Sequence, residues 1–243
     1  MTRKSSTLRI ADLPSPNHGP RKGGARVDML VLHYTGMKTL DAALDRLRDP
    51  ASAVSAHYLI ARDGRVFRLV DESRRAWHAG VACWAGERDV NSRSIGVELE
   101  NPGREFGYRA FSAQQMRALV ALARGILKRH GIPAWRVLGH SDVAPRRKTD
   151  PGEKFPWRAL ARAGIGYWPR QSRANALPDI AATQRALAAI GYEIAVTGKS
   201  NAQTRAVVSA FQRHFRPRRV DGRMDKETSA LAAALTRRAV GPT

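Results

Sequence analysis

The sequence predicts an α/β domain, with a central β-sheet flanked by helices, followed by a small all-α domain of three helices. Up to Trp157, short apolar segments of strand length alternate with segments that carry apolar residues at helical spacing. After about residue 180, three further helical patterns follow one another with no strand of any length between them. These two observations separate the chain into a larger mixed part and a smaller helical part.

The first half of the larger part predicts three strands and one helix. A buried strand is expected at VDMLVLH (27–33), because the apolar run is too short for a helix. Residues 39–49 carry apolar side chains at helical spacing, and Pro50 ends this helix. Residues 55–70 predict two strands joined at Asp63-Gly64, a dipeptide that favours a tight hairpin turn.

The second half of this part continues the alternation. A further strand is expected at SIGVELE (94–100). Ser112 with Gln115 resembles a capping box that opens a helix, and Gly131 closes it. The side chains expected on the inner face of this helix are Met116, Leu119, Val120, Ala123 and Leu127. A short strand then leads directly into His140.

The C-terminal part has a different pattern. Helices are expected at about 180–190, from Ser200 or Asn201 to about Phe215, and from Asp225 onward. Their inner side chains would be Val207, Val208, Phe211, Phe215, Leu231 and Leu235. A core this small is only marginally stable alone, so we expect it to pack against its neighbour.

These patterns divide the chain into four parts. They are an N-terminal extension (1–24), the α/β domain (25–166), a linker (167–179) and the helical domain (180–240). The linker is assigned because its residues are polar, proline-containing and without period.

The composition excludes several classes of protein. The net charge is +21, but the arginines are scattered, and no motif that reads a nucleic-acid groove is present. Two interpretations stay open: attraction to a polyanion such as a bacterial wall, or arginine used on solvated faces. No apolar run reaches the ~18 residues that span a bilayer. The single cysteine, Cys83, excludes an internal disulfide.

The N-terminal segment bears on the compartment. It is basic and has neither the apolar region of an export signal nor a cysteine for lipid attachment. We therefore expect a cytoplasmic protein on the visible sequence, with the periplasm or cell envelope as the alternative if an export signal was removed. A monomer is expected.

Two of the seven histidines end predicted strands and could bind a metal. His33 follows an apolar strand, and His140 follows another, ten residues before Asp150 in a turn-rich loop. Two imidazoles and a carboxylate supply three zinc ligands and leave a fourth position for water, the arrangement of a hydrolytic site. Asp142 is an alternative ligand, but it lies very close to His140 in sequence. The spacing alone leaves the metal site open, because no compact pair of histidines is present.

Five segments occur in an order that identifies a family. They are VLHYTG (31–36), SAHYLIARDG (55–64), AWHAG (76–80), NSRSIGVELEN (91–101) and GHSDVAPRRKTDPGEKFPW (139–157). Together they closely resemble the type-2 N-acetylmuramoyl-L-alanine amidases, whose fold is shared with the peptidoglycan recognition proteins. The resemblance covers about residues 25–165. It implies a mixed sheet, Zn²⁺ as cofactor, and hydrolysis of the amide between N-acetylmuramic acid and L-alanine in peptidoglycan or (anhydro)muropeptides, for wall turnover or recycling.

The resemblance also implies roles for individual residues. The zinc ligands fall on His33, His140 and Asp150. The acid/base carboxylate falls on Glu98, although Glu98 and Glu100 share one face of the strand and the pattern alone does not choose between them. The catalytic lysine falls on Lys148, whose ammonium could stabilise a tetrahedral oxyanion.

Three further residues are candidates for substrate binding. Trp77 and His78 would line the cleft, and His57 would either contact substrate or support the site. A recognition protein without catalysis is the competing hypothesis, but such proteins typically lack one zinc ligand.

The helical domain, in the stretch 180–236, resembles the three-helix peptidoglycan-binding module. Its matching pieces include Gln184, Gly191-Tyr192, Phe211-Gln212 and Val220-Asp221-Gly222, and the usual glycine-rich approach is replaced by HFRPRR (214–219). The expected partner is therefore peptidoglycan or its fragments, and the alternative is a stabilising appendage without a ligand. If the domain only binds wall material, its removal should leave the chemistry on small muropeptides intact.

Overall fold

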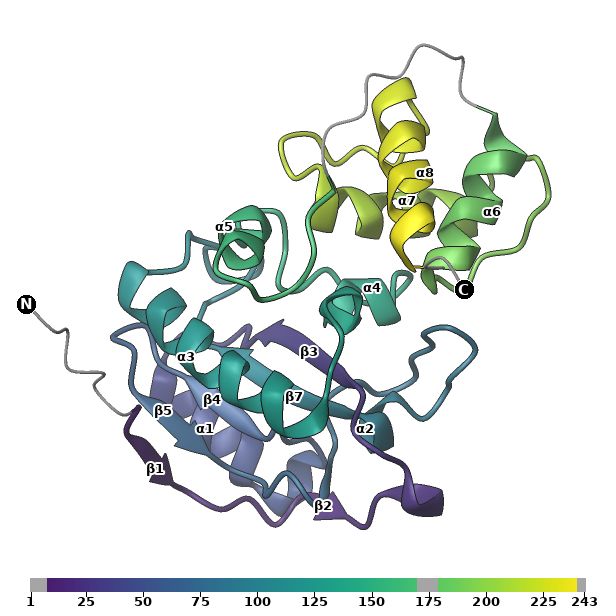
Figure 1. Cartoon of the computed structure of the whole chain (residues 1–243). Helices are drawn as coiled ribbons and strands as arrows, with labels where there is room; N and C mark the ends of the chain where they lie inside the picture. Colours follow the sequence, from purple (N-terminus) through teal and green to yellow (C-terminus); the bar gives the residue numbers. More distant parts are fainter. Residues whose placement is uncertain (1–7, 170–178, 240–243) are drawn as a thin grey trace, which may run out of the picture.

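A computed structural model describes residues 8–169 and 179–239 of the chain. Its centre is a six-stranded sheet in which most neighbouring strands are parallel and the β4–β5 pair is antiparallel. In spatial order the strands are β1 (Ile10–Asp12), β5 (Val66–Arg68), β4 (Tyr58–Ile60), β7 (Ser94–Leu99), β3 (Met29–Tyr34) and β8 (Val137–Gly139). This mixed sheet and the separate group of C-terminal helices confirm the predicted fold class (Figure 1).

The remaining elements are mostly helical. In the α/β part these are α1 (Leu40–Arg48), α2 (Val90–Arg93), α3 (Ala113–His130), α4 (His140–Val143) and α5 (Trp157–Arg162). Short 3₁₀ turns lie at η1 (Lys22–Gly24), η2 (Pro50–Ser52) and η3 (Ala134–Arg136), and a two-stranded ribbon pairs β2 (His18–Gly19) with β6 (Arg75–Ala76). Among the described residues, no helix is long and apolar enough to cross a membrane.

One strand of the sheet lies where the sequence predicts only an extension. Residues Ile10–Asp12 pair in parallel with β5 and form the edge of the sheet. Their side chains are exposed, so the segment has no apolar alternation that would identify it as a strand. The described part of the extension is thus tied to the sheet, whereas residues 1–7 lie outside the described residues.

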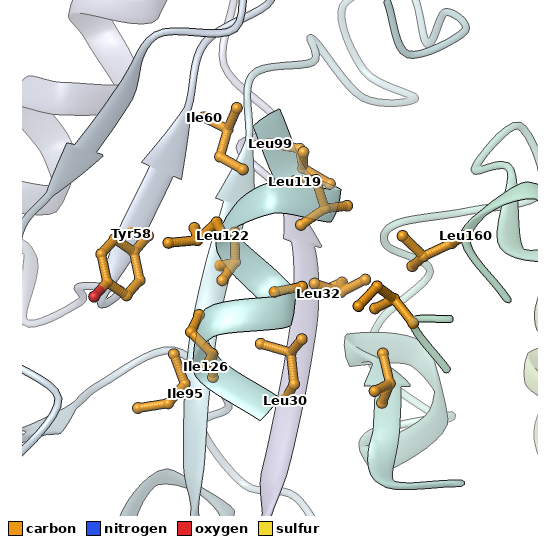
Figure 2. Close-up of a cluster of buried hydrophobic side chains, with 14 of the residues drawn as sticks. Leu30, Leu32, Tyr58, Ile60, Ile95, Leu99, Leu119, Leu122, Ile126 and Leu160 are labelled. Atoms are coloured by element: carbon orange, nitrogen blue, oxygen red, sulfur yellow. The ribbon is translucent and has the colours of Figure 1, made fainter. Parts of the chain in front are cut away.

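The long helix α3 covers one face of the sheet (Figure 1). Alternate residues of the strands, including Leu30, Leu32 and Ile95, point toward it because successive strand side chains face opposite sides. Figure 2 shows these leucines and isoleucines against Leu119, Leu122 and Ile126 of α3. Ala118, Leu119, Leu122, Ala123 and Ile126 are the buried apolar residues of α3, while Met116, Val120 and Leu127 are only partly buried. The expected inner face is therefore rotated by part of a turn.

The start of α3 differs in one detail from a capping box. Ser112 accepts the Gln115 N–H as expected. The Gln115 side chain does not turn back to Ser112; it donates to the carbonyls of Ile60 and Glu100, at 2.9 and 3.1 Å. The fully buried glutamine thus joins α3 to the ends of two strands.

The opposite face of the sheet is covered by two different groups. Near β4 and β5, the α1 residues Ala43, Leu44 and Leu47 pack on Leu59 and Phe67. Near β3, the side chains of Met29 and Val31 belong to a cluster that continues into the C-terminal helices.

The C-terminal helices match the predicted positions. They are α6 (Ile180–Ile190), α7 (Ala202–Phe215) and α8 (Lys226–Ala239), and Val207, Val208, Phe211, Phe215, Leu231 and Leu235 are all buried. Their core is continuous with Met29, Val31, Leu138 and Val143 of the α/β part. The expectation that this domain packs against its neighbour is confirmed. The linker predicted at 167–179 falls mostly on 170–178, outside the described residues.

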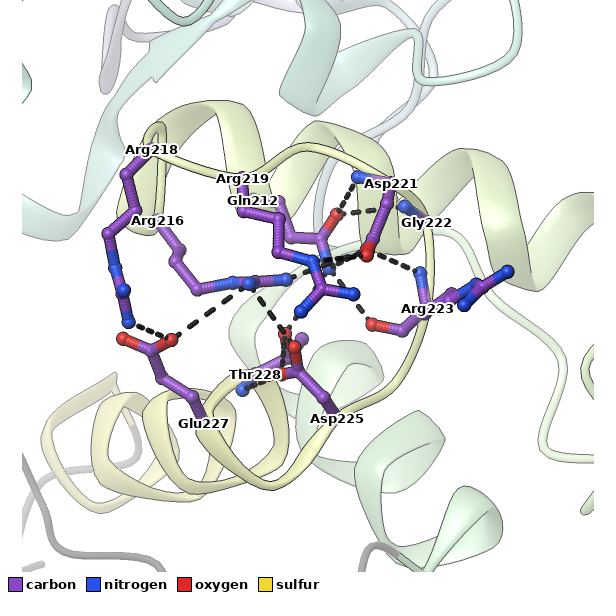
Figure 3. A network of polar contacts seen from close by, with 10 residues as sticks. All are labelled: Gln212, Arg216, Arg218, Arg219, Asp221, Gly222, Arg223, Asp225, Glu227 and Thr228. Atoms are coloured by element: carbon purple, nitrogen blue, oxygen red, sulfur yellow. Dashed lines mark hydrogen bonds and ion pairs between the residues drawn. The ribbon is translucent and has the colours of Figure 1, made fainter.

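The segment between α7 and α8 is held by a polar network, drawn in Figure 3. The side-chain Oε1 of Gln212 accepts the backbone N–H groups of Asp221 and Gly222, both at 2.9 Å. Arg216, 3% exposed, forms ion pairs with Asp221 and Asp225 at 3.6 and 3.2 Å. The arginines of the unusual HFRPRR segment are therefore engaged within the domain: Arg219 pairs with Asp221 and Arg218 with Glu227.

Candidate active site

The candidate site lies at the carboxyl ends of parallel strands, where ligands bind in open α/β sheets. His33 in β3 and Glu98 in β7 are directly paired across the sheet, so their side chains leave on the same face. His140 is the first residue of α4, immediately after β8. Asp150 is brought back to this turn because its carbonyl accepts the Ser141 N–H at 2.9 Å.

Three side-chain atoms converge at this point. His33 Nδ1 and His140 Nδ1 lie 3.0 Å apart. Asp150 Oδ2 lies 3.0 Å from His140 Nδ1 and 3.2 Å from His33 Nδ1. All three residues are at most 7% exposed. Among the described residues, this is the group of histidine, cysteine or acidic side chains arranged to hold a metal ion.

The hydrogen bonds behind His33 fix its tautomer. Ser94 Oγ donates to the Val90 carbonyl at 2.6 Å, so it accepts from His78 Nε2 at 3.2 Å. His78 Nδ1 then carries a lone pair and accepts from His33 Nε2 at 3.1 Å. His33 Nδ1 is left with its own lone pair facing the cluster, which is the form that binds a metal.

A backbone carbonyl holds His140 in the same tautomer, with the proton on Nε2. Its Nε2 donates to the Ala79 oxygen at 3.1 Å, which leaves a lone pair on Nδ1. Asn91 in turn fixes the segment that carries the Ala79 carbonyl, because its side-chain oxygen accepts the N–H groups of His78 and Ala79. Two imidazole lone pairs and a carboxylate oxygen thus face one another in a buried space. Such a set repels itself without a cation, so the residues fit a bound metal.

One glycine makes the His78 contact possible. A Cβ on Gly96 would lie 2.4 Å from His78 Cγ, closer than any real side chain allows. The imidazole therefore packs directly on the backbone of β7, and a larger residue at this position would push His78 away from His33.

The electrostatics keep the ligands in their binding forms. Burial, and then the nearby His140, lower the pKa of His33 to about 4. Burial alone would raise the pKa of Asp150, but the adjacent imidazoles of His140 and His33 hold it well below its usual range. At neutral pH the imidazole is therefore uncharged and the carboxylate ionised.

Glu98 is the carboxyl group beside this cluster. Its Oε2 is buried without a hydrogen-bond partner. Burial, and then the negative charge of Asp150, raise its pKa to about 8, while Lys148 acts in the opposite direction. Glu100, the alternative from the strand pattern, instead accepts the Arg62 N–H at 2.7 Å and lies outside the cleft. The geometry therefore favours Glu98.

A cleft of about 360 Å³ opens over the site. Glu98, Lys148, Trp77 and His78 all border it, as do His140 and Asp150. His57 does not: it is fully buried, and its Nδ1 accepts the Gly96 N–H at 2.9 Å. A buried imidazole with this backbone partner cannot contact substrate, so the structure favours a supporting position for His57.

Two findings were not accessible from the sequence. Asp142 faces away from the cluster, with its carboxylate bonded to Gly139 N, Tyr192 and His214, so it does not compete as a ligand. Ser94 and Asn91, which orient the ligands, gave no signal because a serine or an asparagine beside a strand is usually a turn or cap residue.

Comparison with known proteins identifies the family. The profile described as N-acetylmuramoyl-L-alanine amidase matches residues 23–153, more than half of the chain. The chain belongs to the N-acetylmuramoyl-L-alanine amidase family. A second profile, described as a putative peptidoglycan binding domain, matches residues 177–231 of this amidase. The protein is thus an amidase with a C-terminal helical module of the peptidoglycan-binding type.

Relatives of this amidase span both of its parts. N-acetylmuramoyl-L-alanine amidase AmiD of Escherichia coli (strain K12) is 39% identical over 231 residues, which cover 86% of this chain and 82% of AmiD. The 1,6-anhydro-N-acetylmuramyl-L-alanine amidase AmpD of Enterobacter cloacae is 35% identical over 162 residues, 60% of this chain and 84% of AmpD.

Solved structures agree with this assignment. AmpDh3 from Pseudomonas aeruginosa matches with a TM-score of 0.82 at 35% identity, and covers 99% of this chain and 100% of its own. The complex of AmiD from E. coli with the substrate anhydro-N-acetylmuramic acid-L-Ala-D-gamma-Glu-L-Lys matches with a TM-score of 0.78 at 38% identity, over 88% of this chain and 90% of that chain.

Proposed function

We propose that this amidase is zinc-dependent and that it releases the stem peptide from N-acetylmuramic acid in muropeptides, including 1,6-anhydro forms. The observation that carries the proposal is the unpartnered carboxyl oxygen of Glu98 in a cleft beside His33, His140 and Asp150. The substrate class is supported by the AmiD complex, which contains an anhydromuramoyl tripeptide.

Zinc is the metal that this set of ligands favours. Tetrahedral zinc binds imidazole nitrogen and carboxylate oxygen at about 2.0–2.1 Å, which places its ligands roughly 3.3 Å apart. The three atoms here are separated by 3.0, 3.0 and 3.2 Å. Three protein ligands also leave a position for water, as catalytic zinc sites require. When bound, the ion supplies Lewis acidity and lowers the pKa of water to about 7.

Glu98 is proposed as the acid and base. In its ionised form, Oε2 accepts a proton from the attacking water, because no other hydrogen-bond donor occupies this atom. The protonated carboxyl group then delivers that proton to the nitrogen of L-alanine, which departs as the amine. The raised pKa of Glu98 suits this exchange, since the group holds and releases a proton near neutral pH.

The other cleft residues orient the substrate. Lys148 provides a compact positive charge that stabilises the developing oxyanion. Trp77, which borders the cleft and is partly exposed, offers a ring face for the sugar. His78 borders the cleft as well, but its main contacts orient His33.

The test is hydrolysis of anhydro-N-acetylmuramoyl-L-Ala-D-γ-Glu-L-Lys, followed by chromatography of the released tripeptide. We expect cleavage by the purified protein, loss of cleavage after chelation and recovery on addition of Zn²⁺. Binding of the muropeptide without cleavage, in the zinc-loaded protein, would favour the recognition-protein hypothesis instead.

A further inference from the structure

The helical module makes a buried polar contact with the α/β part at Asp142. This carboxylate is 1% exposed and accepts three hydrogen bonds. Tyr192 Oη donates to Oδ1 at 2.7 Å, and His214 Nδ1 and Gly139 N each donate to Oδ2 at 2.7 Å. Two of the three donors therefore come from the module, 50 and 72 residues away from Asp142 in the sequence.

Both module donors are held in place by packing. Tyr192 is 3% exposed, and its ring lies edge-on to Trp84 with centroids 4.9 Å apart. His214 is stacked between Trp157 and Phe215, at centroid separations of 3.7 and 3.9 Å. Because neither side chain is free to turn, the position of the module fixes the position of the Asp142 carboxylate.

Asp142 in turn holds the turn that carries the metal ligands. Helix α4 is a single turn, His140–Val143, and Asp142 caps it through Gly139 N. The Ser141 N–H donates to the Asp150 carbonyl, so both ligands of this region belong to one small unit.

That unit is tightly packed on its other side. A Cβ on Gly139 would lie 2.8 Å from Pro151 and 3.2 Å from Trp157, the same tryptophan that stacks on His214. The turn therefore has little room to shift independently of the module.

The loop before the site is linked to the module as well. The Ala79 carbonyl orients His140, and a few residues later Cys83 N donates to the Val143 carbonyl at 2.8 Å. Ala85 N then donates to the carbonyl of Gly191 in the module at 2.7 Å. The orienting group of His140 and its capping carboxylate are thus both tied to the same helices.

We propose that the helical module is a structural part of the metal site, in which Tyr192 and His214 act as positioning residues that set the place of His140 and Asp150 through Asp142. The inference rests on the proposed metal site. It assigns the module a role in metal affinity and in the rate of the reaction that does not depend on whether it binds wall material.

Substitutions at His214 separate positioning from packing. His214→Phe keeps a ring between Trp157 and Phe215 but removes the donor to Asp142. His214→Asn loses the ring but can place its amide nitrogen near the Nδ1 position. If His214 acts through its hydrogen bond to Asp142, His214→Phe should weaken metal binding about 10-fold, at the low end of what loss of an outer-sphere partner costs. The metal affinity of His214→Asn should stay closer to that of the wild type. Tyr192→Phe should behave like His214→Phe.

Tyr58→Phe is the matched control. Tyr58 is buried to the same extent as Tyr192 and donates to the Glu72 carboxylate at 2.7 Å, but it belongs to the α3 face of the sheet. The Tyr58→Phe protein should be less stable than wild type but should bind the metal with unchanged affinity.

Metal affinity of the full chain is measured by chelator competition. The visible absorption of the Co²⁺-loaded protein reports ligand geometry, and kcat and KM are measured on the muropeptide. We expect Tyr192→Phe and His214→Phe to alter the Co²⁺ spectrum and to lower kcat more than they raise KM. Wild-type affinity and an unchanged Co²⁺ spectrum in both variants, or His214→Phe binding metal better than His214→Asn, would overturn the inference. A wild-type chain that binds no metal would overturn the proposed function together with it.

Discussion

Replacement of Glu98 by glutamine should stabilise the metal-free protein while it abolishes most of the activity. The side chain is partly buried in the cleft, and its Oε2 has no hydrogen-bond partner. Its pKa is raised from 4.5 to about 8, chiefly by burial. A raised folded-state pKa means that the ionised group destabilises the folded chain.

The size of the effect follows from the two pKa values. The cost is absent below about pH 4.5, grows as the pH rises to about 8, and is constant above that value. At pH 7 the cost is set by the distance of the pH from the unfolded-state pKa of 4.5, which is about 2.5 units. At 1.36 kcal/mol per unit this is about 3 kcal/mol. Glutamine carries no such cost, so Glu98→Gln should gain up to about 3 kcal/mol at pH 7 and close to nothing at pH 4.5.

Urea denaturation of the chelated protein at several pH values measures this gain, and muropeptide hydrolysis of the zinc-loaded protein measures activity. Activity should fall roughly 10²–10⁴-fold, as for removal of a general acid–base group. Glu100→Gln is the control: its carboxylate is satisfied by Arg62 N, so it should be no more stable than wild type and remain active. A stability gain that does not depend on pH, or an inactive Glu100→Gln beside an active Glu98→Gln, would refute the reasoning.

Three further outcomes are expected. The purified protein should contain about one zinc per chain by elemental analysis, and His140→Ala should lose it, with metal affinity falling as the pH drops because imidazole must be neutral to bind. His57 has its pKa lowered to about 3, mainly by burial, so stability should be lost as the pH falls below about 6.5, and His57→Gln should flatten this dependence in acid denaturation curves. Ending the chain after about residue 175 uncovers apolar side chains such as Met29 and Val143, so both the unfolding temperature and hydrolysis of small muropeptides should fall. Intact activity in the truncated protein would instead restore the expectation of a detachable wall-binding domain.

The elements of the fold were largely predictable because their signals are local. The strand at Met29–Tyr34 and the helix closed by Gly131 are each specified by neighbouring residues. The edge strand Ile10–Asp12 was missed because all three of its side chains are exposed, and only its pairing with β5 makes it a strand. The inner face of α3 was misplaced by part of a turn because apolar residues surround more than half of this helix.

The candidate site divides in the same way. His33, His140 and Asp150 could be proposed because strand ends and a family resemblance mark them, and the structure brings their atoms together. The proton positions that make His33 and His140 ligands could not be predicted, because they depend on Ser94 and on the Ala79 carbonyl. These contacts join residues far apart in the chain, and a serine or a carbonyl oxygen has no pattern that announces such a partner.

The helical module shows why resemblance alone leaves a role open. Its motifs are those of a peptidoglycan-binding domain, and the profile of that domain matches it. Yet His214, at the start of the segment that departs from the usual motif, is buried against Trp157 and bonded to Asp142 beside the metal ligands. The arginines that follow are paired with acidic groups of the module itself. His214 and Arg216 are buried and therefore poorly placed to hold a polymer, and His214 is well placed to fix the module against the α/β part. Arg218 and Arg219 are paired but remain on the surface. The histidine at the start of this segment is therefore best explained by docking onto the amidase domain, which a sequence compared only with isolated binding modules could not reveal.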